Sequence, residues 1–312
     1  MNRVVRQAKH MMRHRTGLLK ALFVDRLLTS CEYAFNPTVR AQNARVKREG
    51  APDGLPVPPV PLIYLVTGGQ NIEAFLINGA EGAECIRLIL ERNGLDMNRF
   101  ESILDFGCGC GRIMRHWSGT RGPRLHGSDY NPRLVDWCKK SLPYAEFKLN
   151  SALSRLDYGD GEFDFIYAIS VFIHLDEASQ DFWVAEISRI LRPGGYLLLT
   201  VHGTTRLHEL SPAQRREFES GQLIVTRENY SGRNICAAFH PEEYVRERLC
   251  LGLRVVDFET GERLGIGQTI LREFIGKWAS FLTLLVGYLI VPFRRDKRAL
   301  HDFIAGTQVR RR

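Results

Sequence analysis

The chain of 312 residues is 44% hydrophobic, which is enough to bury the core of one large domain with extensions. Its seven scattered cysteines and the absence of a visible secretory signal argue against a disulfide framework, so we expect a reduced, cytoplasmic protein. The net charge of +8 is concentrated at the ends, because residues 1–20 carry +6 and residues 294–312 carry +5, which leaves −3 for residues 21–293. This distribution is not that of a basic groove along a phosphate backbone, so a nucleic-acid partner is not expected.

Residues 1–49 are expected to form a basic, amphipathic helical extension. Apolar side chains recur there close to helical spacing among lysines and arginines, a pattern typical of a helix on an anionic membrane surface. These apolar residues are Val5, Ala8, Met12, Leu19, Phe23 and Leu27. Residues 50–61 are too rich in proline for a helix or a central strand, so we interpret them as a linker before a main domain at 62–275.

Residues 102–112, Ser-Ile-Leu-Asp-Phe-Gly-Cys-Gly-Cys-Gly-Arg, predict a strand that runs into a nucleotide-binding turn and then a helix. The glycines permit positive φ and let a ligand lie against the main chain. Their spacing is G-x-G-x-G, whereas the dinucleotide fingerprint is G-x-G-x-x-G. Asp105 precedes the turn, where a carboxylate suits a cationic ligand better than a pyrophosphate. S-adenosylmethionine is such a ligand, since it carries a sulfonium and an ammonium and no phosphate.

The next two strand-like runs end in polar residues suited to an adenosine. Asp129 closes the run at 124–129, at about the 20-residue separation expected of a carboxylate that accepts from ribose hydroxyls. Tyr130 follows it and is expected to pack on the adenine. The run at 145–149 is followed by Asn150 and Ser151, and either side chain can accept a hydrogen bond.

Four segments in this order resemble the motifs of the class I S-adenosylmethionine-dependent methyltransferases, and the resemblance covers about residues 100–272. They are 103–112, 127–131, 163–175 and 191–200. The resemblance implies an α/β fold with a doubly wound, Rossmann-like sheet of seven mostly parallel strands, including an antiparallel edge hairpin at 253–259 and 267–272. Strand-like runs at 101–106, 124–129, 145–149, 163–169 and 195–202 alternate with helix-patterned segments, as a parallel sheet requires.

The resemblance also implies a set of cofactor contacts, in which the three glycines hold the methionine end of S-adenosylmethionine. Asn150 and Ser151 stand where the family commonly has an Asp at the adenine amine, and either side chain can accept from that amine. A Cys-x-Cys pair without a matching second pair argues against zinc, so we expect no metal and interpret the two turn cysteines as small packing residues. The expected cofactor-binding residues are Asp105, Gly107, Cys108, Gly109, Gly111, Arg112, Asp129, Tyr130, Asn131, Asn150, Ser151 and Ser170.

Three histidines are candidates for a catalytic base. Methyl transfer is a displacement at carbon, so the main tasks are to align the acceptor and exclude water, and a hydroxyl acceptor also needs a base. His174 follows the fourth strand-like run, His202 ends the fifth, and His240 closes an insertion at 204–240. Each also has a structural interpretation: His174 can anchor the next helix, and His240 can fix a turn. The insertion lies at the carboxyl edge of the sheet, and we assign acceptor selection to it.

Residues 276–312 are expected to form an apolar helix with a basic tail. The apolar stretch at 278–293 is shorter than the roughly 20 residues of an ordinary spanning helix. Two interpretations stay open: contact with an anionic membrane surface, or packing on the core or on a second subunit, which would make an oligomer.

The pattern after the fourth strand helps to select the acceptor. Methyltransferases of base or glutamine nitrogens typically carry Asn or Asp followed by Pro-Pro and an aromatic there, whereas this chain has Ala-Ile-Ser-Val at 168–171. We therefore predict O-methylation of a small-molecule, glycan or lipid-linked acceptor at the inner face of the membrane. The alternatives are an RNA or protein methyltransferase that docks through its basic tails, and a catalytically silent, membrane-associated scaffold of the same fold.

Overall fold

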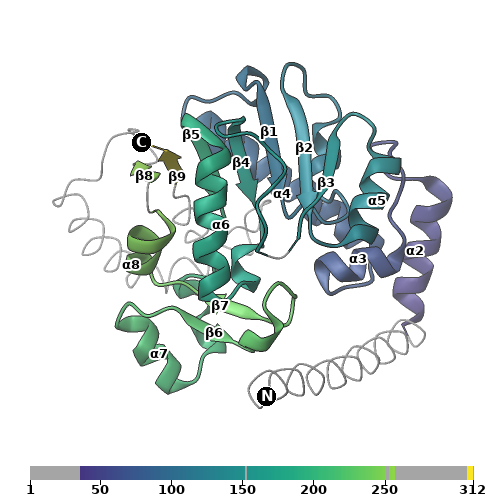
Figure 1. The fold of residues 1–312 in the computed structure, drawn as a ribbon. Coiled ribbons are helices and arrows are strands. Elements are labelled where there is room, and N and C mark those ends of the chain that lie inside the picture. The colour runs from purple at the N-terminus through teal and green to yellow at the C-terminus, as the bar shows by residue number, and fades with distance from the viewer. Residues whose placement is uncertain (1–35, 152, 251–252, 257–307, 312) are drawn as a thin grey trace, which may run out of the picture. The chain divides into compact units, whose positions relative to one another are not determined.

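The computed structural model describes residues 36–151, 153–250, 253–256 and 308–311 (Figure 1). The chain divides into two compact units, residues 1–77 and residues 78–312. Within the described residues, no single helix has the length and hydropathy of a membrane span. Helices α3 (Val60–Thr67) and α4 (Ile72–Arg92) meet those criteria only as a pair, by length and composition, and they are bent by 48°.

In the first unit, a buried asparagine holds α2 (Pro37–Glu49) to the start of α4. The Nδ2 of Asn43 donates to the Gln70 carbonyl at 2.8 Å, and its Oδ1 accepts from the Ile72 amide at 2.8 Å. Helix α3 begins at Val60, inside the segment predicted as a linker. Prolines are tolerated at that position because the first turn of a helix has no intrahelical partner for their missing N–H groups.

Five parallel strands form the centre of the second unit, in the order β3-β2-β1-β4-β5. Helix α5 (Pro132–Ser141) connects β2 to β3, and α6 (Glu177–Ile190) connects β4 to β5. All residues of β1 and β4 are buried, as in strands that are covered on both faces. This arrangement confirms the predicted Rossmann-like α/β fold, and it places a ligand outside the carboxyl ends of the strands near β1 and β4. The strands are β1 (Ser102–Phe106), β2 (Arg124–Asp129), β3 (Glu146–Leu149), β4 (Phe163–Ala168) and β5 (Leu191–Leu199).

A buried carboxylate fixes the start of β1 beside β4. The Oδ2 of Asp164 accepts from the amides of Glu101 and Ser102 at 2.7 and 2.8 Å, and its other oxygen pairs with Arg192. Asp164 is only 2% exposed, so its ionised oxygens replace water as partners of these groups. The contact sets the position of β1, and therefore of the glycine turn at the far end of that strand.

Three elements differ from their predicted form. The segment after the glycine turn consists of turns and a short 3₁₀ helix, η2 (Met114–Trp117), because the stretch between Gly111 and Gly119 is too short for a stable α-helix. Strand β5 begins directly after α6, earlier than predicted. Strand β8 (Leu253–Val256) lies where the first edge strand was expected, but its antiparallel partner is β9 (Gln308–Arg311), which also pairs with β5. The expected partner at 267–272 lies outside the described residues.

The insertion at 204–240 forms a small antiparallel sheet of its own, separate from the main sheet and beside one end of α6 (Figure 1). It consists of η4 (Thr204–Glu209), α7 (Pro212–Glu219), β6 (Ile224–Thr226), η5 (Glu228–Tyr230) and β7 (Ala237–Phe239). The remaining short elements are η1 (Met97–Arg99), η3 (Phe172–His174), α8 (Glu242–Tyr244) and the π-helix η6 (Val245–Leu249).

Candidate active site

The glycine turn uses its backbone N–H groups inside the protein. The amides of Gly107 and Cys108 donate to the Ser128 carbonyl of β2 at 2.8 and 3.0 Å, and the Gly111 amide donates to the Cys108 carbonyl at 3.0 Å. The amide of Gly109 donates to a carboxylate oxygen of Asp129 at 2.9 Å. A dinucleotide-binding turn points such groups at a pyrophosphate, so this turn suits a ligand without phosphate.

The same turn requires glycine for steric reasons. Gly107, Gly109 and Gly111 have φ values of 77°, 58° and 78°, in the region that side chains disfavour. A Cβ on Gly107 would lie 2.4 Å from Cγ2 of Val171, and one on Gly111 would lie 2.4 Å from Cδ1 of Leu142. The turn therefore packs directly against the segment that follows β4 and against the end of α5.

Cys108 lies buried below this turn. Its thiol contacts that of Cys138, and this hydrogen bond, together with burial, raises the pKa of Cys108 well above its ordinary value. Cys110 is also buried, and burial raises its pKa strongly. Both side chains are therefore neutral packing groups, and Cys108 can border a cofactor through its backbone.

Asp129 lies at the carboxyl end of β2, next to the glycine turn, and is 6% exposed. In addition to the Gly109 amide, its carboxylate accepts from the amide of Asn131 at 2.8 Å and from that of Tyr130. Burial raises the pKa of Asp129, and the three backbone donors oppose that rise. A carboxylate has about four acceptor positions, so these bonds orient its oxygens and still leave capacity for a ribose hydroxyl.

A buried hydrogen-bonded chain holds the other acid of the site, Asp105. Tyr167 of β4 lies opposite Asp105 of β1, its hydroxyl bonds to the Asp105 carboxyl, and the Trp117 Nε1–H donates to the Tyr167 oxygen at 2.9 Å. Burial raises the pKa of Asp105 to about 7, although the Tyr167 bond and the charge of Arg112 both lower it. The acid therefore titrates near neutrality, and a neighbouring cation would favour its ionised form.

Sequence reasoning missed Tyr167 and Trp117. The only local signal was a tyrosine within an otherwise apolar strand, and the contact to Trp117 spans 50 residues.

The adenosine-side residues predicted from the sequence gather at the ends of β2 and β3. Tyr130 has 53% of its surface exposed, which leaves its ring accessible to a base. The Asn150 amide donates to the Asp129 carbonyl at 3.0 Å, and its Oδ1 is buried without a partner in the described structure. Ser151 is exposed beside it. The Asn131 side chain accepts from the Arg133 amide at 3.1 Å, so it caps α5.

Two further predicted residues flank Asp105 and the end of β4. Arg112 is partly buried, and burial lowers the pKa of its guanidinium while the Asp105 charge opposes that shift. Ser170 is an exposed residue with a φ of 60°, and its amide donates to Thr200 Oγ1 at 2.7 Å. A non-glycine residue in the left-handed region is uncommon and is found often at functional sites.

These residues fit S-adenosylmethionine. The amides of residues 107–109 already donate hydrogen bonds inside the protein, so they are not available to a phosphate. A Cβ added at Gly107 or Gly111 would overlap the neighbouring side chains. Asp129 can accept from a ribose diol, and the orphaned Asn150 oxygen can accept from an adenine amine. Asp105 supplies an acid for a cationic end of the ligand.

The three candidate histidines, distant in sequence, are close enough in the fold to affect one another. The charge of His174 lowers the pKa of His202, and the charge of His202 lowers that of His240, in both cases after the larger effect of burial. The amide of His240 donates to the His202 carbonyl at 2.7 Å. The structure thus brings these residues together beside the end of β4.

Their environments differ. His174 Nδ1 lies 2.7 Å from the Cys236 carbonyl, and burial lowers the pKa of its partly exposed ring. His202 is partly exposed, and its ring packs on Phe239 with centroids 5.4 Å apart. His240 is 2% exposed, and its Nε2 lies 3.1 Å from the Gln180 Oε1. This location favours the structural interpretation of His240, as a residue that fixes the end of the insertion.

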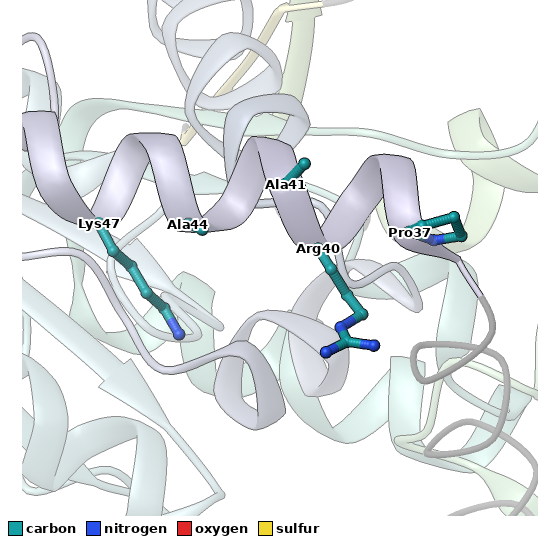
Figure 2. Close-up of a pocket in the computed structure, with 5 residues that line it drawn as sticks. All are labelled: Pro37, Arg40, Ala41, Ala44 and Lys47. Carbon is teal, nitrogen blue, oxygen red and sulfur yellow. The ribbon is translucent and has the colours of Figure 1, made fainter.

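A surface cavity of about 450 Å³ lies on α2 (Figure 2). Its lining residues all come from one helix: Pro37, Arg40, Ala41, Ala44 and Lys47. It includes none of the predicted site residues, so it does not alter the assignment of the site to the carboxyl ends of the strands.

Residues 104–199 match the family model described as a methyltransferase domain, and residues 248–306 match the RDD family. The chain is 29% identical over 119 residues to methyltransferase GfsG of Streptomyces halstedii, covering 35% of this chain and 42% of that protein. It is 28% identical over 121 residues to a malonyl-[acyl-carrier protein] O-methyltransferase of Enterobacter lignolyticus, covering 39% and 47%. The chain thus spans less than half the length of these two curated relatives. A solved S-adenosylmethionine-dependent methyltransferase from Methanosarcina mazei is 24% identical, with 50% of this chain and 81% of that chain covered and a TM-score of 0.38.

Proposed function

We propose that this chain, whose residues 104–199 match a methyltransferase domain, is an S-adenosylmethionine-dependent enzyme that methylates an oxygen of a small-molecule, glycan or lipid-linked acceptor. The observation that carries this proposal is the hydrogen bond of His174 Nδ1 with the Cys236 carbonyl, beside the end of β4, because it assigns the ring hydrogen to Nδ1 and the lone pair to Nε2. The names of O-methyltransferases among the relatives support oxygen as the accepting atom.

The cofactor would be held by three groups of residues. Asp129 accepts from the ribose, Tyr130 and Asn150 contact the adenine, and the glycine turn with Asp105 faces the methionine end. When bound, S-adenosylmethionine supplies an electrophilic methyl group on a sulfonium. The protein's task is then to align the acceptor oxygen with that methyl and to exclude water.

The hydrogen bond to Cys236 gives His174 the geometry of a general base. A carbonyl oxygen can only accept, so Nδ1 of His174 carries the hydrogen and Nε2 keeps its lone pair in the neutral ring. Burial lowers the pKa of His174, so the ring is neutral at pH 7. Its Nε2 can then take the proton from a hydroxyl acceptor as the new bond forms. His202, next to it, would assist by contacting the acceptor.

We further propose that the acceptor is met at the cytoplasmic face of a membrane, with the basic ends of the chain on the anionic surface. This proposal depends on the amphipathic pattern at 1–49 and on the apolar stretch at 278–293 beside its basic cluster. Both segments lie wholly or largely outside the described residues. The apolar stretch falls within the part that matches the RDD family.

The test is mass spectrometry of a cell extract incubated with the full chain and methyl-labelled S-adenosylmethionine. The proposal predicts label on the oxygen of a small or lipid-linked product, and production of S-adenosylhomocysteine. The variant His174→Gln should lose most of this activity and still bind S-adenosylhomocysteine. Label on RNA or on a protein side chain would contradict the proposed acceptor class, and no label at all would favour a silent scaffold.

A further inference from the structure

The loop at 231–236, within the insertion, is hydrogen-bonded to the segment that carries His174. The Gly232 amide donates to the His174 carbonyl at 2.6 Å, and the Cys236 carbonyl accepts from the His174 ring at 2.7 Å. The Asp176 amide donates to the Ser231 hydroxyl at 2.8 Å. Three bonds thus hold this short loop on both sides of the proposed base.

The charge of an arginine in this loop acts on Tyr130, which is proposed to contact the adenine. Arg233 lies close enough to Tyr130 that its charge acts on the phenol, opposing the rise in the Tyr130 pKa that burial causes. Tyr130 follows β2, whereas His174 follows β4, and β1 lies between these strands. The loop that is hydrogen-bonded to the His174 segment therefore also brings the charge of Arg233 near the residue that follows β2.

Arg233 brings a positive charge to this position. Its side chain is partly buried, and no carboxylate of the described residues forms an ion pair with it. Other arginines of the described residues are paired: Arg206 pairs with Glu209 at 2.8 Å, and Arg248 pairs with Asp181 at 2.8 Å. A partly buried guanidinium without an acid is costly, and it offers the fork geometry that binds carboxylate or phosphate.

We propose that Arg233 binds an oxyanion of the methyl acceptor, a carboxylate or a phosphate, so that the acceptor is an anionic compound. This inference rests on the proposed function. The loop then has two roles: it orients the base through Cys236, and it fixes the acceptor through Arg233. An acceptor held by its anion beside His174 would present its oxygen to the methyl group at a fixed orientation.

The test is isothermal titration calorimetry. The full chain is first saturated with S-adenosylhomocysteine and is then titrated with inorganic phosphate or, in a separate experiment, with acetate. The wild-type protein should bind at least one of these anions saturably, and the preferred anion identifies the acceptor group. Arg233→Gln should weaken that binding at least about tenfold, since a charge-assisted bond is lost. Arg233→Lys should retain part of it. The matched control is Arg227→Gln, an exposed arginine of the same insertion, which should bind as the wild type does.

The affinity for S-adenosylhomocysteine separates the outcomes. It should stay within about twofold in all variants, because none of the proposed cofactor-binding residues is substituted. The inference is overturned if the wild type binds neither anion, if Arg233→Gln binds them equally well, or if that variant weakens only the cofactor. A wild-type protein that does not bind S-adenosylhomocysteine would refute the proposed function itself, a result distinct from a failure of anion binding.

Discussion

Acidification should destabilise the folded chain through His240. Its ring is 2% exposed, and Gln180 fixes its hydrogen-bonding pattern. The Gln180 Nε2 donates to the carbonyls of Phe172 and Leu175 at 3.4 and 3.0 Å, so its Oε1 faces the histidine and accepts from Nε2 of His240. The Nδ1 of His240 is buried and makes no hydrogen bond of good geometry within the described residues, so an added proton there would be poorly solvated.

The magnitude follows from the two protonation equilibria. Burial, with a smaller effect of His202, lowers the pKa of His240 from 6.5 to about 3, although the interaction with the Ala238 backbone raises it. The unfolded chain therefore binds a proton near pH 6.5 that the folded chain does not bind. The stability from the neutral ring is complete above pH 6.5 and falls by about 1.4 kcal/mol per pH unit below it. Between pH 7 and pH 5 the loss due to this residue is about 2 kcal/mol.

The assay is urea denaturation of the full chain at pH 7, 6 and 5, for the wild type and for His240→Gln. The variant should be less stable at pH 7, because the site is buried, but its stability should fall less steeply with acidification. The gap between the two proteins should shrink by about 2 kcal/mol at pH 5. His208→Gln is the control, since the His208 side chain is 70% exposed and the variant should keep the wild-type slope. Equal slopes for wild type and His240→Gln would refute the reasoning.

Three further perturbations test the turn and its supports. Gly107→Ala should lower the stability by about 1–3 kcal/mol in thermal melts and reduce the affinity for S-adenosylhomocysteine, because φ at this position is 77° and the added Cβ would meet Val171. An unchanged melting temperature would contradict this. Tyr167→Phe should raise the pKa of Asp105 above about 7, because the hydrogen bond from Tyr167 lowers that pKa. Calorimetry across pH 6–9 should then show the affinity for S-adenosylmethionine rising at a higher pH than in the wild type. An unshifted profile would argue that Asp105 does not face the cation. Asp164→Ala should lower the free energy of unfolding by about 3 kcal/mol, because two amides lose their acceptor, and a loss below about 1 kcal/mol would show that water replaces the carboxylate.

The sheet and the glycine turn could be predicted because their signals are local. The buried strands β1 and β4 are short, mostly apolar runs, and the three turn glycines all adopt positive φ. Asp129 could be predicted as a ribose-binding residue from its separation along the sequence from the glycine turn. Its bond to the Gly109 amide, which excludes a phosphate from that amide, depends on the pairing of β1 with β2 and has no signal in the sequence.

The acceptor side could be predicted only in outline. The insertion and the histidines were visible, but the contact between His174 and Cys236 joins residues 62 positions apart. The role of His240 could not be predicted for a similar reason, because its partner Gln180 is 60 positions away and the contact depends on how the insertion folds. The prediction of a helix after the glycines was wrong for a local reason. A second glycine-containing turn, at Gly119, leaves only a short stretch of chain in which a helix could form.

The central claim is that the glycine turn and Asp129 form a site for S-adenosylmethionine. Calorimetric titration of the full chain with S-adenosylhomocysteine tests it most directly, with Asp129→Ala and Asp129→Asn as variants. The wild type should bind one molecule per chain, and Asp129→Ala should weaken binding at least about 30-fold, since hydrogen bonds to a carboxylate contribute about 1.5–3 kcal/mol each. Asp129→Asn should fall between them, because it keeps one acceptor. No binding by the wild type, or equal affinity in Asp129→Ala, would contradict the account.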